Sequence, residues 1–388
     1  MSKKILCCVM AALLALTVVL AGCGAETPDS SSSVPAEDSA ASGDASEPAS
    51  EPAADAPSVL LVCGNANDKS FAESAANGLK ELEAQYGCET KVVEIGSDTT
   101  KIIPTLEDVS GGEWDLIVTV GFQYAEPLAE VAPQFPEQKY LICDTQMDYT
   151  DGANANVYSV DYKGNEGAFL SGALAAMVTT SDMENANPEK MVGFVGGMDM
   201  TLINDFVIGF IQGAHEIDPE VKVSTSYVGS FDDSAKGKEM ANTLYNAGCD
   251  LVYNGAGNAG LGVLDAAKEQ NKYAIGTDSD QSLMFADDEV KANLILTSQL
   301  KRIDATILTV VKGMMDGSLQ FGSGATFGIK EGAIGLADND YYKANVSQEM
   351  RDKVAELEGK VLSGEIVVDT AYGMETDAIK AAIDAARP

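Results

Sequence analysis

Polar, aromatic and glycine residues that could hold a small molecule follow the predicted strands of this chain. They lie at Asn65–Phe71, Gly121–Phe122, Asp144, Gly196–Asp199, Phe231–Asp233, Gly255–Asn258 and Asp278–Gln281. In open parallel sheets, ligands bind outside the carboxyl ends of the strands. An aromatic ring can stack on a flat ligand, a carboxylate can accept hydrogen bonds from hydroxyls, and a glycine lets the backbone approach closely. These residue types suit capture of a small molecule without chemical turnover.

Residues for covalent or metal chemistry are scarce in the sequence. His215 is the single histidine, so no convincing Ser-His-Asp or Cys-His set can be built. Cys63, Cys88, Cys143 and Cys249 lack CxxC spacing, which argues against zinc or dithiol chemistry. The glycine-rich stretches GGMD and GAGNAGLG lack the Lys-Ser or Lys-Thr pair of a phosphate-binding loop. We therefore expect no enzyme activity, no metal and no cofactor.

The candidate residues require a scaffold of alternating strands and helices, and the chain shows this pattern twice. Short apolar runs such as VLLVCG at 59–64 and LIVTVG at 116–121 are typical of buried parallel strands. Segments with helical spacing of apolar residues, such as 70–86, separate these runs. The pattern restarts after 157–162. We predict an α/β fold of two doubly wound parallel-sheet lobes with a ligand cleft between them.

The length and charge of the chain limit its organisation and its partners. Residues 58–388 exceed one ordinary domain, which favours two lobes. We expect lobe 1 at 58–160, lobe 2 at 161–283, a return to lobe 1 at 284–325 and the C-terminal part of lobe 2 at 326–388. With 60 Asp and Glu against 25 Lys and Arg, the chain lacks the basic footprint of a nucleic-acid-binding protein.

The first residues have the layout of an exported lipoprotein. Lys3 and Lys4 precede an apolar run at 5–20, which is shorter than the roughly 20 residues of a membrane-spanning helix and is typical of a signal peptide. The tetrapeptide LAGC at 20–23 resembles the bacterial lipobox, so we expect cleavage of residues 1–22 and acylation of Cys23. Residues 24–57 are almost all Ala, Ser, Pro, Asp and Glu, which predicts a disordered acidic tether. The folded part would then stand at the extracytoplasmic face of the cell membrane, held there by its lipid anchor.

Eight stretches along the folded part resemble the basic membrane protein family of substrate-binding lipoproteins, whose members include purine-nucleoside receptors. They are NDKSFAESAANGL at 67–79, VGFQYAEPLAEVA at 120–132, EGAFLSGALAA at 166–176, VGFVGGMD at 192–199, YVGSFDDSAKGKEMA at 227–241, GAGNAGLGVLDAAKE at 255–269, GTDSDQ at 276–281 and TSQLKR at 297–302. Together they span nearly the whole folded part in the order found in the family. The resemblance implies a type I periplasmic-binding-protein fold and an ABC transporter permease as partner. We also expect the protein to be a monomer.

The resemblance also implies roles for residues at matching positions. Phe71 and Phe231 match two aromatic rings that enclose a purine base, and Asp68 and Asp144 match acids near the base. Groups on the ribose side are matched by Gly255, Asp278 and Lys301. This chain departs from the family pattern at Ala72, where an Asn is usual; an Asn can hydrogen-bond a base edge through both of its polar groups. The departure leaves the base preference open.

Other functions share parts of this pattern. Type I binding folds also hold sugars and autoinducers, so the fold does not decide the cargo. A ligand-loaded lipoprotein could instead dock on a signalling receptor. An enzyme such as a nucleoside hydrolase would need its acid cluster near the chain start, whereas the first predicted strand here ends in CGNANDKS. Phe71 and Phe231 could be ordinary core residues, and Asp68 could cap the helix that follows it.

Overall fold

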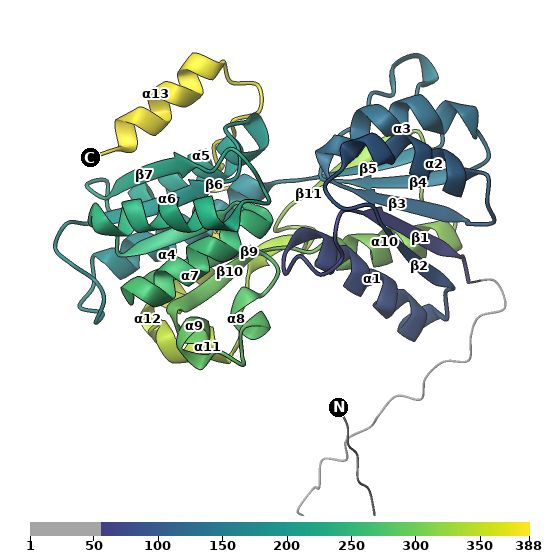
Figure 1. The fold of residues 1–388 in the computed structure, drawn as a ribbon. Helices are drawn as coiled ribbons and strands as arrows, with labels where there is room; N and C mark the ends of the chain where they lie inside the picture. Colours follow the sequence, from purple (N-terminus) through teal and green to yellow (C-terminus); the bar gives the residue numbers. More distant parts are fainter. Residues whose placement is uncertain (1–55) are drawn as a thin grey trace, which may run out of the picture. The chain divides into compact units, whose positions relative to one another are not determined.

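The computed structural model describes residues 56–388, which form two lobes, each built on a six-stranded sheet (Figure 1). The predicted signal peptide, the acylated Cys23 and nearly all of the acidic tether lie outside the described residues. Within the described part of the chain, no helix is long and apolar enough to cross a membrane. The predicted arrangement of two sheets, dominated by parallel pairing and flanked by helices, is confirmed.

The sheet of lobe 1 is parallel throughout and has the strand order β11-β5-β4-β3-β1-β2. Its strands are β1 (Val59–Cys63), β2 (Thr90–Glu94), β3 (Leu116–Val120), β4 (Lys139–Cys143), β5 (Val157–Tyr162) and β11 (Ser323–Phe327). Its helices are α1 (Phe71–Tyr86), α2 (Ile102–Ser110), α3 (Ala125–Val131) and α10 (Ile303–Met315).

Both faces of this sheet are covered by helices, which explains the continuous apolar runs of its central strands. In β1, Leu61 belongs to the core that includes residues of α1 and α10, whereas Leu60 and Val62 belong to the core that includes residues of α2 and α3. All five residues of β1 are fully buried.

The sheet of lobe 2 has the order β12-β10-β9-β8-β6-β7, in which β12 alone is antiparallel to its neighbour. Its strands are β6 (Met191–Gly196), β7 (Lys222–Tyr227), β8 (Leu251–Gly255), β9 (Tyr273–Asp278), β10 (Ile295–Lys301) and β12 (Ile334–Leu336). Its helices are α4 (Gly164–Thr179), α5 (Thr201–Ile217), α6 (Ser234–Asn246), α7 (Leu261–Gln270), α8 (Gln281–Met284), α9 (Glu289–Leu294), α11 (Asp340–Asn345), α12 (Gln348–Ser363) and α13 (Thr376–Ala386). Helices α4 and α5 pack so closely that a Cβ at Gly213 would lie 1.9 Å from the carbonyl oxygen of Phe169. Only a glycine fits at this position.

Single 3-10 turns complete the described elements. They are η1 (Thr99–Lys101), η2 (Phe122–Tyr124), η3 (Ala132–Gln134), η4 (Thr150–Gly152) and η5 (Gly257–Gly260). Two of them, η2 and η5, directly follow the carboxyl ends of β3 and β8 and therefore lie where a ligand of a parallel sheet would bind.

The chain crosses between the two lobes three times. The first crossing follows β5, close to the predicted boundary at 160/161. The second lies at Arg302 rather than at the predicted residue 284, because β10 pairs in parallel with β9 and so belongs to the sheet of lobe 2. The third follows Phe327, since β11 pairs with β5 in lobe 1.

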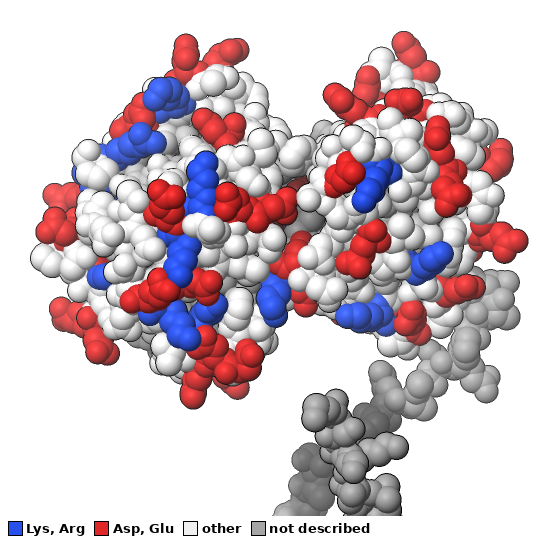
Figure 2. Space-filling view, in the orientation of Figure 1, with Lys and Arg blue, Asp and Glu red and all other residues white. Residues whose placement is uncertain are grey.

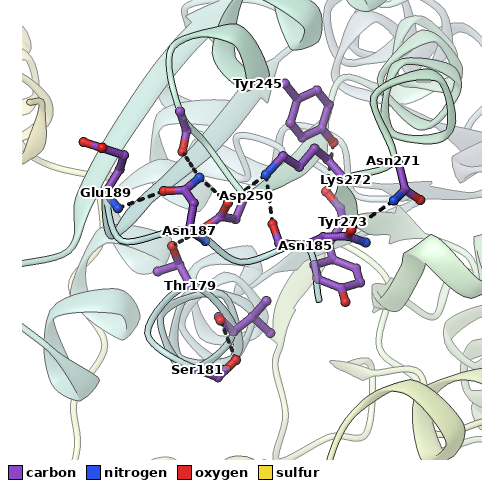
Figure 3. A network of polar contacts seen from close by, with 12 residues as sticks. Thr179, Ser181, Asn185, Asn187, Glu189, Tyr245, Asp250, Asn271, Lys272 and Tyr273 are labelled. Carbon is purple, nitrogen blue, oxygen red and sulfur yellow. Dashed lines mark hydrogen bonds and ion pairs between the residues drawn. The ribbon is translucent and has the colours of Figure 1, made fainter. Parts of the chain in front are cut away.

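A buried polar network holds the edge of lobe 2 that lies at the amino end of β8 (Figure 3). The Asp250 carboxylate is fully buried and accepts hydrogen bonds from the Thr179 hydroxyl at 2.8 Å and from the Asn187 backbone N–H at 2.9 Å. It also pairs with the Lys272 ammonium at 3.0 Å. Because its charge is paired and hydrogen-bonded, this acid anchors the loop between α4 and β6.

Acidic side chains are spread over the face of the molecule shown in Figure 2, with Lys and Arg interspersed among them. No continuous basic area is visible on this face. The face shown agrees with the formal net charge of −35 and offers no basic surface of the kind that nucleic acid requires.

Candidate ligand-binding site

A cavity of about 620 Å³ is lined by residues that follow the strands of both lobes. All seven residues singled out from the sequence line it: Asp68, Phe71, Asp144, Phe231, Gly255, Asp278 and Lys301. They meet because the carboxyl ends of parallel strands lie at one edge of each sheet, and these edges contribute to the same cavity. The structure therefore brings the whole predicted set together.

Lys301 is the last residue of β10 and is only 4% exposed. Its Nζ lies 2.6 Å from Oδ1 of Asp144, which directly follows β4 in the other lobe. Burial of the ammonium acts to lower the pKa of Lys301, but the carboxylates of Asp144 and Asp278 outweigh it and raise the pKa above its ordinary value. Lys301 therefore stays charged inside the cavity and links the two lobes.

Asp278 ends β9 and is held by a contact from lobe 1. The Ser70 hydroxyl donates to its Oδ2 at 2.6 Å. Burial raises the pKa of Asp278, while Lys301 and the Ser70 hydrogen bond act in the opposite direction. One oxygen of this carboxylate is thus engaged by the protein. The other has no hydrogen-bond partner among residues 56–388 that would compete with a ligand hydroxyl.

The loop before α1 reaches across to lobe 2 at the same place. The Ser279 hydroxyl donates to the carbonyl oxygen of Ser70 at 2.7 Å, and the Gln281 side-chain amide donates to that of Lys69 at 3.0 Å. These contacts fix the approach of the two lobes beside Asp278.

The two acids that follow strands have an uncommon backbone conformation. Asp144 has φ 72° and Asp278 has φ 64°, in the left-handed region that non-glycine residues seldom occupy. Such strain of roughly 1–3 kcal/mol per residue is concentrated at ligand-binding positions. The conformation turns each carboxylate toward the cavity at the end of its strand.

Four phenylalanine side chains surround the polar centre of the cavity. The Lys301 Nζ lies 5.3 Å from the ring centroid of Phe71 and 5.4 Å from that of Phe206. The rings of Phe122 and Phe231, from opposite lobes, lie 6.4 Å apart at an interplanar angle of 57°. A flat ligand between two parallel rings needs about 7 Å between them, twice the usual carbon–carbon contact distance. At the present separation, a flat ligand does not fit between Phe122 and Phe231 themselves.

Glycines make room for the Phe231 ring. A Cβ at Gly197 would lie 2.4 Å from ring atoms of Phe231, and one at Gly255 would lie 2.7 Å from the ring of Phe194. A side chain at either position would clash with an aromatic ring. Gly255 also lines the cavity, and a ligand contact through its backbone stays a prediction.

Asp68 has a structural role in addition to its place on the cavity wall. Its carboxylate accepts hydrogen bonds from the backbone N–H groups of Ser70, Ala72 and Glu73 at 2.9, 2.9 and 3.1 Å. These bonds satisfy the free N–H groups at the start of α1 and hold Phe71 in position. A contact between Asp68 and a ligand stays a prediction.

The described side chains that could ligate a metal or act as nucleophiles are dispersed or buried. Among residues 56–388, no group of three His, Cys, Asp or Glu side chains is placed to hold a metal ion. The thiols of Cys63 and Cys143 are buried, and burial raises the pKa of each to about 12, so they are unreactive at neutral pH. The ring of His215 lies at the far end of α5, where its Nε2 is 3.2 Å from the carbonyl oxygen of Val221.

Residues 57–371 match the family model described as "Bmp: ABC transporter substrate-binding protein PnrA-like". The chain belongs to the Bmp family. It is therefore a substrate-binding protein of an ABC transporter, a class that is extracytoplasmic and passes a small molecule to a permease.

Relatives and solved structures agree with this assignment. Basic membrane protein A of Borreliella burgdorferi is 29% identical over 312 residues, which cover 80% of this chain and 86% of that protein. The ABC transporter nucleoside-binding protein BmpA of Lactococcus lactis is 28% identical over 384 residues, covering 94% of this chain and 99% of that protein. An ABC transporter solute-binding protein from Aeropyrum pernix superposes with a TM-score of 0.72 at 28% identity, covering 85% of this chain and all of that one.

Sequence reasoning missed two aromatic members of this Bmp-family site as ligand contacts. Phe122 was among the strand-end residues, but no role was assigned to it. Phe206 lies in the second turn of α5, four residues after Leu202, and both line the cavity. The available signal was the helical spacing of these two residues directly after the strand-end stretch GGMD.

Proposed function

We propose that this Bmp-family protein is a lipid-anchored receptor that captures a purine nucleoside and delivers it to an ABC importer. The observation that carries the proposal is a cavity in which aromatic rings surround a buried lysine and two strand-end carboxylates. Aromatic rings suit a flat base, and the charged groups suit the hydroxyls and ring oxygen of a ribose. The name of the Lactococcus lactis relative supports the same class of ligand.

In this proposal the base is enclosed by Phe71 and Phe231. Stacking of a base on an aromatic side chain contributes roughly 1–3 kcal/mol.

The ribose lies toward the charged end of the cavity. The free oxygen of Asp278 accepts from a ribose hydroxyl, and Lys301 donates to a ribose oxygen. The part of Asp144 is to keep Lys301 charged and in place, since its Oδ1 lies 2.6 Å from the ammonium. Gly255 lets the backbone approach the sugar without a clash.

The test is isothermal titration of the purified full chain, stripped of carried-over ligand, with guanosine, inosine, adenosine, cytidine and ribose. We expect one-to-one binding of purine nucleosides and little heat from ribose. Binding of ribose as tight as that of the nucleosides would contradict the role of the rings. Absence of binding to all four nucleosides would overturn the proposed cargo.

The proposed anchor is tested separately from the cargo. Cells that produce the chain are labelled with radioactive palmitate, and the same is done for Cys23→Ser. We expect label on the native chain and none on the variant. Equal labelling of both would exclude acylation at Cys23.

A further inference from the structure

Five residues of lobe 1 contribute a part of the cavity wall that we call the pouch. Its walls are the side chains of Ala72, Ile95, Ile102, Val120 and Tyr124, from the starts of α1 and α2 and from the ends of β2 and β3. Four of these side chains are hydrocarbon, and Tyr124 carries a hydroxyl. The polar residues Asn65, Ser97, Thr99 and Gln123 of lobe 1 also line the cavity. Ala72 adds only a methyl group at the place where the first turn of α1 faces the pouch.

The Tyr124 hydroxyl is a polar group without a partner in an otherwise well-satisfied interior. Tyr124 is 1% exposed, and no residue among 56–388 hydrogen-bonds its hydroxyl. Among the described residues, three side chains have a polar atom that is both unpaired and fully enclosed: Asn154, Thr225 and Asp304. Tyr124 is not among them, so its unpaired hydroxyl has access to open space. The hydroxyl of Tyr124 therefore opens on the cavity that its residue lines.

A buried phenol without a hydrogen bond is unfavourable, so its retention at a cavity wall indicates a partner that arrives with the ligand. Burial, with a smaller contribution from nearby Cys63, raises the pKa of Tyr124. The hydroxyl therefore remains protonated at all physiological pH values and can donate a hydrogen bond.

The strand order places Tyr124, on the turn after β3, between the end of β4, which Asp144 follows, and the ends of β1 and β2. Neighbouring strands run in the order β4-β3-β1-β2, with Asp144 after β4 and Ile95 after β2. Three strand spacings of about 4.8 Å separate these ends by roughly 14 Å. A ligand whose sugar lies at Asp144 and Lys301 thus extends its ring past Phe71 toward the pouch.

We propose that Tyr124 determines which nucleoside this protein selects, by a hydrogen bond from its hydroxyl to the oxygen at C6 of a purine base, on the edge away from the ribose. The proposal rests on the proposed function and deepens it. It assigns recognition of the base to a residue on η2, because the methyl group of Ala72 on α1 can form no hydrogen bond.

The test compares inosine with purine riboside, which lacks the oxygen at C6 and the proton that inosine carries at N1. Both are titrated into the full chain and into Tyr124→Phe, which removes one oxygen and keeps the ring. We expect the native protein to prefer inosine by about tenfold, the worth of one net hydrogen bond at a buried site. In Tyr124→Phe the affinity for inosine should fall about tenfold and that for purine riboside should change less than twofold.

Tyr140→Phe is a matched control. Tyr140 is fully buried in the same core, and its hydroxyl donates to Ser110 at 2.7 Å, away from the cavity lining. It should leave the preference for inosine unchanged. An equal loss for both nucleosides in Tyr124→Phe, or an unchanged preference, would overturn the proposal and leave Tyr124 a packing residue. A native protein that binds neither probe would overturn the proposed function as well, an outcome distinct from the loss of the Tyr124 role alone.

Discussion

Replacing Lys301 with methionine tests whether the ion pair between the lobes stabilises the fold as well as the site. The change keeps an unbranched side chain of similar length but removes the charge. It leaves the Asp144 carboxylate, 7% exposed, without the ammonium that lies 2.6 Å away. Because both partners are almost fully buried, solvent screening does not reduce the effect, and we expect the free energy of unfolding to fall by about 3–5 kcal/mol.

The double variant Lys301→Met, Asp144→Asn separates the two causes of this loss. If the loss arises from an unpaired buried carboxylate, removing that charge as well should restore most of the stability. Recovery should be incomplete, because Asp278 keeps only its hydrogen bond from Ser70. Urea unfolding followed by fluorescence of the single Trp114 measures both variants.

Two results would refute this reasoning. A loss below about 1 kcal/mol in Lys301→Met would place the pair among exposed ion pairs, which contribute little. A double variant as unstable as the single one would show that packing of the lysine stem, rather than charge, carries the effect.

Three further predictions concern the ring, the distal network and pH. Phe231→Ala should weaken purine-nucleoside binding by roughly 5- to 150-fold, as measured by calorimetry. The control Phe285→Ala, which lies outside the cavity lining, should keep the native affinity. An affinity of Phe231→Ala equal to that of the native protein would remove Phe231 from the site. Asp250→Ala should lower the free energy of unfolding by about 3–5 kcal/mol without changing nucleoside affinity, because Asp250 is fully buried at the strand end away from the cavity (Figure 3); a loss of affinity would contradict this separation. Burial raises the pKa of Asp205 above 3.8, so its contribution to stability is complete below that pH and is lost as pH rises through the folded-state value. Urea unfolding from about pH 4 to about pH 7 should show this fall, and an equal fall in Asp205→Asn would assign it to other groups.

Much of the site could be predicted because strand-end residues of a parallel sheet are set by local pattern. The fully buried strands β1 and β3 appear in the sequence as apolar runs, and the residues that follow them must lie at one edge of the sheet. That rule predicts that Phe71, Asp144 and Asp278 lie near one another, and all three line the same cavity.

Other features depend on contacts that no local pattern encodes. The apolar run of β10 could have paired in either lobe, and only its pairing with β9 shows that the crossing lies at Arg302. Asp68 follows a strand like the other acids, but the backbone N–H groups at the start of α1 engage its carboxylate. Residue type alone could not separate the helix cap from the ligand acid.

The sequence by itself determined the α/β class, the two lobes and the set of side chains at their facing edges, because periodicity and strand ends are local properties of the chain. Tertiary structure alone decided which polar side chains pair. Lys301 pairs with Asp144, 157 residues away in the sequence, and Ser70 hydrogen-bonds Asp278, 208 residues away. The Tyr124 hydroxyl has no hydrogen-bond partner among the described residues. Hydrogen bonds and burial depend on which surfaces meet when the lobes pack, and the spacing of residues along the chain does not contain that information.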